Sequence, residues 1–173
     1  MNFKYFKKKF YFDFFLIIFI FFIDRISKIY VINFSEKNNT SEIFSSKFLN
    51  FHLIWNEGIA FGLFSFDEFY LYNTVSIIIL IIILVLLIMI FKSHGLKKYS
   101  FILIFGGALG NFYDRLFYKA VPDFIDFHIN NFHWFIFNIA DIFITTGVIF
   151  VILCEIVGNN SKIDEKKLLK YLR

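Results

Sequence analysis

One uninterrupted apolar stretch constrains this chain more than any other feature. Residues 70–91, YLYNTVSIIILIIILVLLIMIF, contain no charged side chain. A bilayer core about 30 Å thick is crossed by roughly 20 residues of helix. A helix that is apolar on every side must be buried in protein or lipid. The stretch therefore predicts a transmembrane helix and excludes an ordinary soluble domain.

Three further stretches are long and apolar enough to cross a membrane. Over the whole chain 58% of residues are hydrophobic and the mean hydropathy is +0.67, values typical of a membrane protein. The first stretch resembles a secretory signal, but Asp24 and Arg25 follow it where a cleavage site would need small residues, so we interpret it as a retained helix. We expect an all-α membrane protein with four transmembrane helices, at about residues 10–32, 69–91, 99–118 and 138–158.

The basic residues gather on alternate loops of this arrangement. Eleven of the fifteen lysines lie in residues 1–9, 92–98 and 159–173, whereas the other two loops lean acidic. This is the positive-inside pattern, and it places both termini in the cytoplasm. The net charge of +4 therefore reports membrane topology and gives no reason to expect a nucleic-acid partner. We expect one membrane-embedded domain, 1–173, with a small β-rich element outside the membrane from about residues 33–66 and 119–137.

The unusual polar residues all fall at one depth. At 1.5 Å per residue, Asp24 lies roughly 21 Å above the cytoplasmic start of the first helix, and Asn111 to Arg115 lie roughly 18–24 Å above that of the third. The outer loops and the start of the last helix carry the others, Asn56, Asp123, Asp126, Asn138 and Asp141. A transporter usually places ionisable groups near the bilayer midplane. A polar ring at the outer boundary favours a catalytic or recognition site.

Two short blocks have both a structural and a functional interpretation. In DRISK, residues 24–28, Asp24 and Lys28 are four apart on one helical face, so they can form an ion pair that either seats the helix end or shapes a site. Ser27 and Lys28 point about 100° apart, which excludes a serine–lysine dyad. In NEGIAF, residues 56–61, Asn56 and Gly58 favour a turn.

The block GGALGNFYDR, residues 106–115, combines close packing with polar groups. Gly106 and Gly110 are spaced to let two helices approach closely. Asn111, Asp114 and Arg115 share one helical face. We expect Arg115 to keep its neighbour Asp114 ionised, which suits a strut between helices better than an acid–base catalyst. Both roles remain open from the residues alone.

The last two blocks supply a carboxylate each. In VPDFID, residues 121–126, the apolar neighbours of Asp123 hold it in poor solvent, which raises the pKa of a carboxyl group. In FNIAD, residues 137–141, Asn138 suits the N-cap of the last helix, and Asp141 at the third helical position faces the positive end of the helix dipole. Capping explains both residues, and so does a pair of carboxylates meeting at one surface.

Together, in this order and on this topology, the five blocks resemble the lipoprotein signal peptidases, the type II signal peptidases of bacteria. The resemblance covers about residues 24–141 and implies an aspartic endopeptidase of the bacterial cytoplasmic (inner) membrane. Such an enzyme removes the signal peptide from lipidated prolipoproteins by cutting before a diacylglyceryl-modified cysteine. It implies Asp123 and Asp141 as the catalytic pair. The implied supporting and substrate-contacting residues are Asp24, Lys28, Asn56, Gly58, Asn111, Asp114, Arg115 and Asn138.

The implied chemistry needs no metal and no cofactor. Two carboxylates close together share one proton, so one member can activate water while the other protonates the leaving amine. His128 and His133 are five residues apart, a poor spacing for metal ligands, and the single Cys154 excludes an internal disulfide. Pro122 stands where the family usually has a branched aliphatic residue, and it can shift Asp123. A carboxylate-lined transporter and a non-catalytic assembly subunit are the alternative functions.

Overall fold

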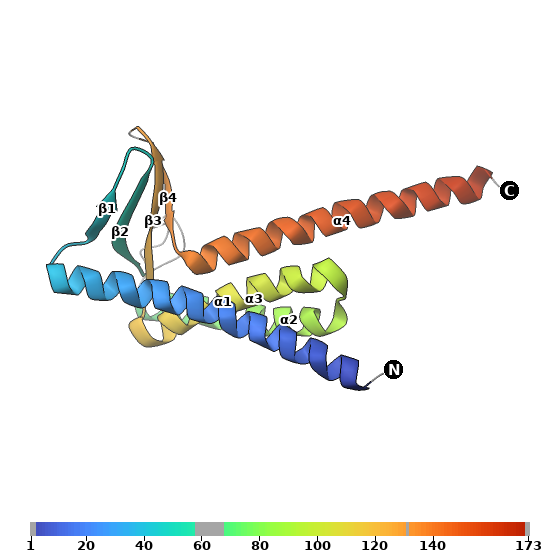
Figure 1. Ribbon diagram of the computed structural model, residues 1–173, viewed down its shortest axis with the longest axis horizontal. Helices are drawn as coiled ribbons and strands as arrows, with labels where there is room; N and C mark the ends of the chain where they lie inside the picture. Colours follow the sequence, from blue (N-terminus) through green and yellow to red (C-terminus); the bar gives the residue numbers. More distant parts are fainter. Residues whose placement is uncertain (1–2, 58–67, 131, 172–173) are drawn as a thin grey trace.

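The computed structural model describes the backbone of residues 3–57, 68–130 and 132–171, and the side chains of residues 9–57, 73–130 and 132–158. Within these ranges the chain forms four helices and one small antiparallel sheet (Figure 1). The elements in chain order are α1 (Phe3–Asn38), β1 (Glu42–Ser45), β2 (Leu49–Asn56), α2 (Glu68–Lys92), α3 (Gly95–Tyr118), β3 (Val121–Ile129), β4 (Phe132–Phe137) and α4 (Ile139–Tyr171).

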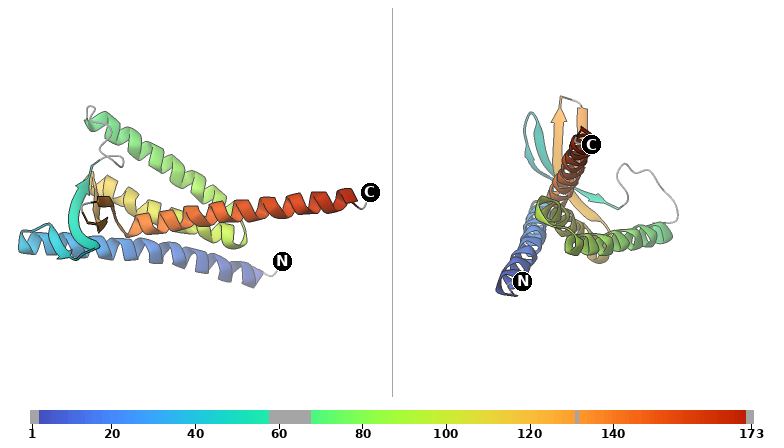
Figure 2. Two further views of the ribbon diagram at one scale, coloured as in Figure 1. Left: turned by 90° about the horizontal axis from the view of Figure 1, so that it is seen from above. Right: turned by 90° about the vertical axis from the view of Figure 1, so that its right-hand side faces the viewer.

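The helices are arranged around α3, which packs against α1, α2 and α4. Both chain termini and the junction between α2 and α3 lie at one end of the molecule, and the sheet lies at the other (Figures 1 and 2). At the terminal end, Asp13 of α1 bonds Lys98 of α3, and Lys97 bonds Glu155 of α4. The segments rich in lysine thus share one end of the molecule, as the charge pattern predicts.

Two helical segments of the described chain are long and apolar enough to span a membrane by length and composition. They are Asn73–Lys92, with a mean hydropathy of 3.5, and Ile139–Gly158, with a mean hydropathy of 2.2. The other two long helices, α1 and α3, carry charged residues within their apolar stretches. The expectation of four membrane crossings therefore stays a prediction, to which we return below.

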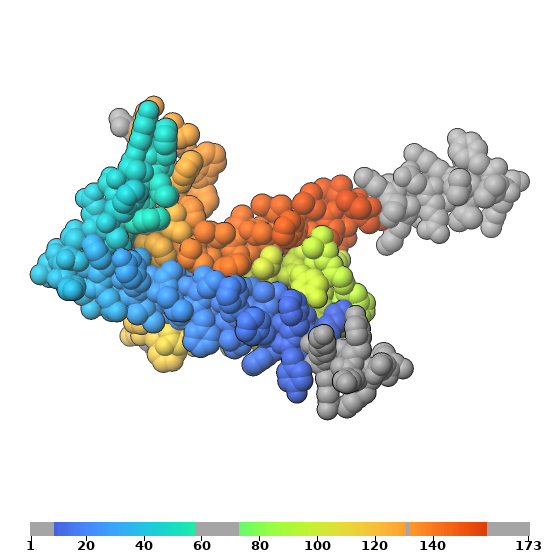
Figure 3. Space-filling model, viewed as in Figure 1, coloured from blue at the N-terminus to red at the C-terminus, as the bar shows by residue number. Residues whose placement is uncertain are grey.

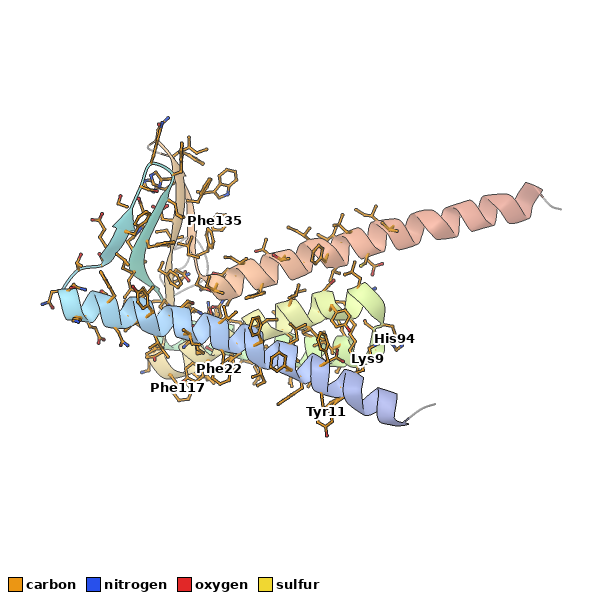
Figure 4. All side chains as sticks on the ribbon, viewed as in Figure 1. Lys9, Tyr11, Phe22, His94, Phe117 and Phe135 are labelled. Carbon is orange, nitrogen blue, oxygen red and sulfur yellow. The ribbon has the colours of Figure 1, made fainter. Side chains whose placement is uncertain are left out.

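The helices bury a small apolar core and expose apolar side chains outward. Ile20, Ile83, Ile102 and Phe105 belong to one buried cluster contributed by α1, α2 and α3. Large apolar side chains on the outer surfaces of these helices are more than half exposed, among them Tyr11, Phe22 and Phe117, which Figure 4 labels. An apolar outer surface of this kind is suited to lipid rather than water.

Glycines set the close approach of α3 to its neighbours. A Cβ built on Gly106 would lie 2.9 Å from the Ile20 side chain of α1, and one on Gly110 would collide with Asp24. Ile20 and Asp24 are four residues apart on α1, as the two glycines are on α3, so the two helices meet along one stripe. The prediction that Gly106 and Gly110 permit close helix packing is confirmed.

The sheet has the strand order β1-β2-β3-β4 with antiparallel neighbours, and it stands out from the helices at the end where α1 finishes (Figure 3). The expected β-rich element is confirmed. Its predicted start at residue 33 is wrong, because α1 continues to Asn38. Val31, one residue before the predicted end, packs against Phe124 of the sheet. Asn39, with φ at 51°, then ends the helix in the left-handed conformation.

Candidate active site

The start of α4 carries a reciprocal pair of caps. Asn138 precedes the first helical residue, and its side-chain oxygen accepts a hydrogen bond from the Asp141 backbone N–H at 3.1 Å. In return the Asp141 carboxylate accepts a hydrogen bond from the Asn138 backbone N–H, also at 3.1 Å. The capping role expected for both residues is therefore confirmed. It uses one oxygen of Asp141 and leaves its second oxygen for another partner.

Asp123 lies on β3 and is buried among apolar neighbours. Burial raises the pKa of the Asp123 carboxyl from 3.8 to about 6, and the charge of Asp141 adds to the increase. Hydrogen bonds from Asn56 and Asn138 act in the opposite direction and only partly offset the burial. The expectation that poor solvent raises the pKa of this carboxyl is confirmed.

Amides hold all four oxygens of the two carboxylates. The side-chain nitrogen of Asn138 donates to Oδ1 of Asp123 at 2.6 Å, and that of Asn56 donates to Oδ2 at 3.0 Å. The side-chain nitrogen of Asn111 donates to Oδ1 of Asp141 at 2.8 Å. One residue, Asn138, therefore bonds both carboxylates. Each of the four oxygens therefore has an N–H donor that fixes its position and still has a lone pair free for a proton.

A buried lysine joins the first and third helices. The Lys28 ammonium donates to Asp24 at 2.9 Å, to Asn111 at 2.8 Å and to Asp114 at 2.7 Å. An ammonium group has three donors, so this lysine is fully satisfied although its side chain is completely buried. Asn111 accepts from Lys28 and donates to Asp141, and it thereby links the charged cluster to the carboxylate pair.

Asp24 connects α1 to the start of α4. Its second oxygen accepts a hydrogen bond from the Ala140 backbone N–H at 3.0 Å. That N–H is one of the groups that a helix leaves unpaired at its first turn, so α1 satisfies part of the end of α4. The same carboxylate packs against Gly110, where any larger residue would displace it. Asp24 therefore fixes how α1, α3 and α4 meet.

The cations beside Asp114 differ from the one that the sequence suggested. Lys28 and Arg25, both from α1, form its salt bridges, and Arg25 also lies over the Tyr113 ring at 4.9 Å. Arg115 instead donates to the Asn111 backbone carbonyl at 3.2 Å. The expectation that Arg115 is the cation that pairs with Asp114 is therefore wrong. Neighbours along a helix point apart, whereas α1 brings two cations directly onto the Asp114 side chain.

Arg25 was not predicted as a site residue, although it lies inside the DRISK block. Two cations, Lys28 and Arg25, face two anions, Asp24 and Asp114, so this buried cluster has no net charge. A buried charge is costly unless it is paired. The sequence did contain an indication of this role, because an arginine inside an apolar helix requires an anionic partner.

The structure brings together nearly all the residues that the sequence singled out. Nine of them join one hydrogen-bonded set, namely Asp24, Lys28, Asn56, Asn111, Asp114, Arg115, Asp123, Asn138 and Asp141. Arg25 is attached to this set by its salt bridges with Asp24 and Asp114. Gly58 lies outside the described residues. The salt bridges formed among the described residues include neither Asp123 nor Asp141. The set thus consists of two parts. In one, cations and anions form salt bridges, and in the other, amides hold the carboxylates of Asp123 and Asp141.

Comparison with known proteins identifies the family. The family model described as signal peptidase (SPase) II matches residues 16–157. The lipoprotein signal peptidase of Pelagibacter ubique (strain HTCC1062) is 50% identical over 159 residues, which cover 92% of this chain and 96% of that protein. The lipoprotein signal peptidase of Anaplasma marginale (strain Florida) is 36% identical and covers 82% of each chain.

Solved structures agree with this assignment. A structure titled as a bacterial membrane enzyme, determined by the in meso method at 2.3 Å, superposes with a TM-score of 0.72 at 29% identity and covers 87% of this chain and 90% of its own. A second with the same title, at 1.9 Å, gives 0.69 at 30% identity, with 82% and 90% covered. The fold, the motif residues and these relatives agree: the chain belongs to the signal peptidase II family of aspartic endopeptidases.

Proposed function

We propose that this protein removes the signal peptide from diacylglyceryl-modified prolipoproteins by cutting before the lipidated cysteine, with Asp123 and Asp141 as its catalytic pair. Its relatives bear the name lipoprotein signal peptidase. The observation that carries the proposal is that Asn138 bonds two carboxylates that form no salt bridge among the described residues. Its backbone N–H donates to Asp141 and its side-chain amide donates to Asp123. A transporter or an assembly subunit gives no reason for such a pair.

The two carboxylates have different environments, which suits a division of roles. The pKa of Asp123 is raised to about 6, so this residue is the better candidate for the member that holds the shared proton. Asp141 lies in the first turn of α4, near the positive end of the helix dipole. In the proposed reaction, charged Asp141 takes a proton from water, which attacks the scissile carbonyl. Asp123 then protonates the leaving amine.

The neighbouring amides and charges position this pair. Asn111 and Asn138 hold both carboxylates in place, and Asn56 fixes the outer side of Asp123. Asp24, Lys28, Asp114 and Arg115 support the site through Asn111 and through the contact between α1 and α4. We assign these residues to positioning and the two aspartates to the chemistry. No step of this mechanism requires a metal or cofactor.

We further propose that α1, α2, α3 and α4 all cross the bacterial inner membrane, with both termini cytoplasmic and the site at the outer face. The support is that charges inside the apolar stretches of α1 and α3 pair with each other, Arg25 and Lys28 of α1 with Asp114 of α3. Residues 1–173 would then be one membrane-embedded peptidase domain. Single cysteines at Ser41 and Ser93 in a Cys154→Ala background test the topology. An impermeant thiol reagent added to spheroplasts should label Ser41→Cys alone, and labelling of Ser93→Cys alone would refute it.

The proposed position of the site at the outer face implies that the lipid on the substrate increases the rate of cleavage. Each buried methylene of an acyl chain contributes about 0.8 kcal/mol of membrane anchoring, so two chains hold a scissile bond at that depth. The test compares two matched precursors, one treated with diacylglyceryl transferase and one untreated, by gel shift with purified enzyme. We expect rapid cleavage of the lipidated precursor and far slower cleavage of the other. Equal rates would show that peptide sequence alone is recognised.

The same assay tests the catalytic pair. Asp141→Asn should keep the α4 cap but abolish cleavage, because an amide caps a helix yet cannot accept a proton from water. Glu155→Gln makes the same chemical change near the middle of α4, where Glu155 bonds Lys97 and not the site residues, and it is the matched control, expected to cleave normally. Near-normal turnover by Asp141→Asn, with Glu155→Gln also active, would leave Asp141 only a capping role.

A further inference from the structure

A second buried carboxylate on β3 lies among three of the chain's four histidines. Asp126 is completely buried, and its Oδ2 lies 2.8 Å from Nδ1 of His133. The Nδ1 atoms of His52 and His128 are each 4.0 Å from the same oxygen. Asp123 has a different set of partners, so this cluster is separate from the proposed catalytic pair.

Strand register, not sequence spacing, brings the histidines together. β3 and β4 pair antiparallel with His128 directly opposite His133, and the two rings stack with centroids 5.0 Å apart. His52 comes from β2 on the other side of β3. Five residues along the chain is a poor spacing for two ligands on a helix, and it is the reason that the sequence predicted no metal. On a hairpin, residues on opposite strands become neighbours.

Two polar atoms in the cluster are buried and unpaired. Oδ1 of Asp126 and Nδ1 of His128 have no hydrogen-bond partner among the described residues. A buried donor or acceptor left in this state costs about 1–3 kcal/mol. One of these unpaired atoms is a carboxylate oxygen and the other is an imidazole nitrogen, and both atom types bind metal ions. We infer that the cluster binds an ion that both side chains can coordinate.

We propose that Asp126, His128 and His133 bind a divalent transition metal of the zinc class. Their ligand atoms all lie within 4.8 Å of one another. Zinc bonds of about 2.0–2.2 Å to nitrogen and oxygen place tetrahedral ligand atoms roughly 3.3 Å apart, so small side-chain rotations close the site. Imidazole with one carboxylate suits zinc, copper or nickel and not calcium or magnesium.

The surroundings complete the site. The His133 side chain is 55% exposed, which leaves an entry route for the ion, whereas Asp126 and His128 are enclosed. His52 lies near enough for the fourth position. The amide of Asn50 donates to Oδ2 of Asp126 at 3.4 Å and acts as an outer contact that orients this ligand.

The bound metal would fasten β4 to the strand that carries Asp123. Asp126 follows Asp123 by three residues on β3, and all three ligands lie on the hairpin that β3 forms with β4, Asp126 and His128 on β3 and His133 on β4. The metal therefore has a structural role at the outer face. The proposal does not depend on the peptidase activity, and its test reads metal binding directly.

The test uses the full-length protein in detergent, purified with a tag that contains no histidine and stripped with a chelator. Zinc chloride is titrated in by calorimetry, and bound zinc is counted after dialysis. X-ray absorption at the zinc edge identifies the ligand atoms. His133→Gln is the principal variant because its exposed side chain can be replaced without disturbing the fold. His94→Gln is the matched control, since Figure 4 places His94 near Lys9, at the opposite end from Phe135 of β4.

We expect about one zinc per chain in the wild type and in His94→Gln, nitrogen and oxygen ligands without sulfur, and a higher melting temperature with zinc than without. His133→Gln should bind at least about tenfold more weakly and lose the zinc-dependent increase in melting temperature. Asp126→Asn should behave in the same way. The proposal is overturned if the wild type binds no zinc, or if His133→Gln binds it as tightly as His94→Gln does.

Discussion

Replacing Asp123 with asparagine should remove activity, and it should also remove a loss of stability that the wild type undergoes as the pH rises to neutral. The folded state raises the pKa of this carboxyl from 3.8 to about 6, chiefly through burial. Between these two values the folded protein holds a proton that the unfolded chain has released. The stability due to the protonated carboxyl is therefore fully present below about pH 4 and is lost as the pH rises through about 6. Asparagine stays neutral throughout and avoids this loss.

The size of the effect follows from the two pKa values. The interval from 3.8 to about 6, at 1.36 kcal/mol per pH unit, corresponds to about 3 kcal/mol in total. About 2 kcal/mol of this falls between pH 4 and pH 7.5. For a chain of this length, that corresponds to about 4–8 °C in melting temperature. In the variant, one oxygen of Asp123 is replaced by an NH₂ group that faces the N–H donors of Asn56 and Asn138. The energetic cost of this mismatch does not change with pH.

The measurement is the melting temperature of wild type and Asp123→Asn in detergent at pH 4, 5, 6 and 7.5. The difference between the two proteins should move in favour of the variant by about 4–8 °C over this range. Glu36→Gln, which neutralises an exposed carboxylate on α1, is the control and should show no such trend. A difference that stays constant with pH would refute the reasoning, because the carboxyl would then titrate alike in the folded and unfolded states.

Three further substitutions test the support around the pair. Lys28→Met should lower stability by about 3–5 kcal/mol in a denaturant titration, because it leaves buried carboxylates without their ammonium. Asp114→Asn should lose activity together with melting temperature; full stability with complete inactivity would instead place Asp114 in the chemistry. Gly110→Ala should reduce both stability and cleavage, because its methyl group meets Asp24, whereas Gly158→Ala, where a Cβ meets nothing within 4 Å, should reduce neither.

Features set within one turn of helix could be predicted from the sequence. Asn138 and Asp141 cap α4 as predicted, since a cap depends on residues three positions apart. Asp24 and Lys28 pair as predicted for the same reason. The raised pKa of Asp123 could also be predicted, because the apolar residues that surround it include its own neighbours in the strand.

Contacts between distant segments could not be predicted in this way. Nothing in the local pattern placed Lys28 against Asp114, 86 residues away, or Arg25 in the role assigned to Arg115. His128 and His133 appeared too far apart for a shared ligand until strand register set them opposite each other.

The sequence by itself determined the class of molecule and identified nearly every residue of the hydrogen-bonded set. The length of an apolar stretch, the positions of charges and the caps of helices are local properties. They depend on neighbouring residues and not on the position of distant segments. Only the tertiary structure decided which polar groups bond one another. The bonding partners depend on the position of α1 along α3, which close packing at Gly106 and Gly110 sets. They also depend on the register of β3, which pairing with the neighbouring strands sets.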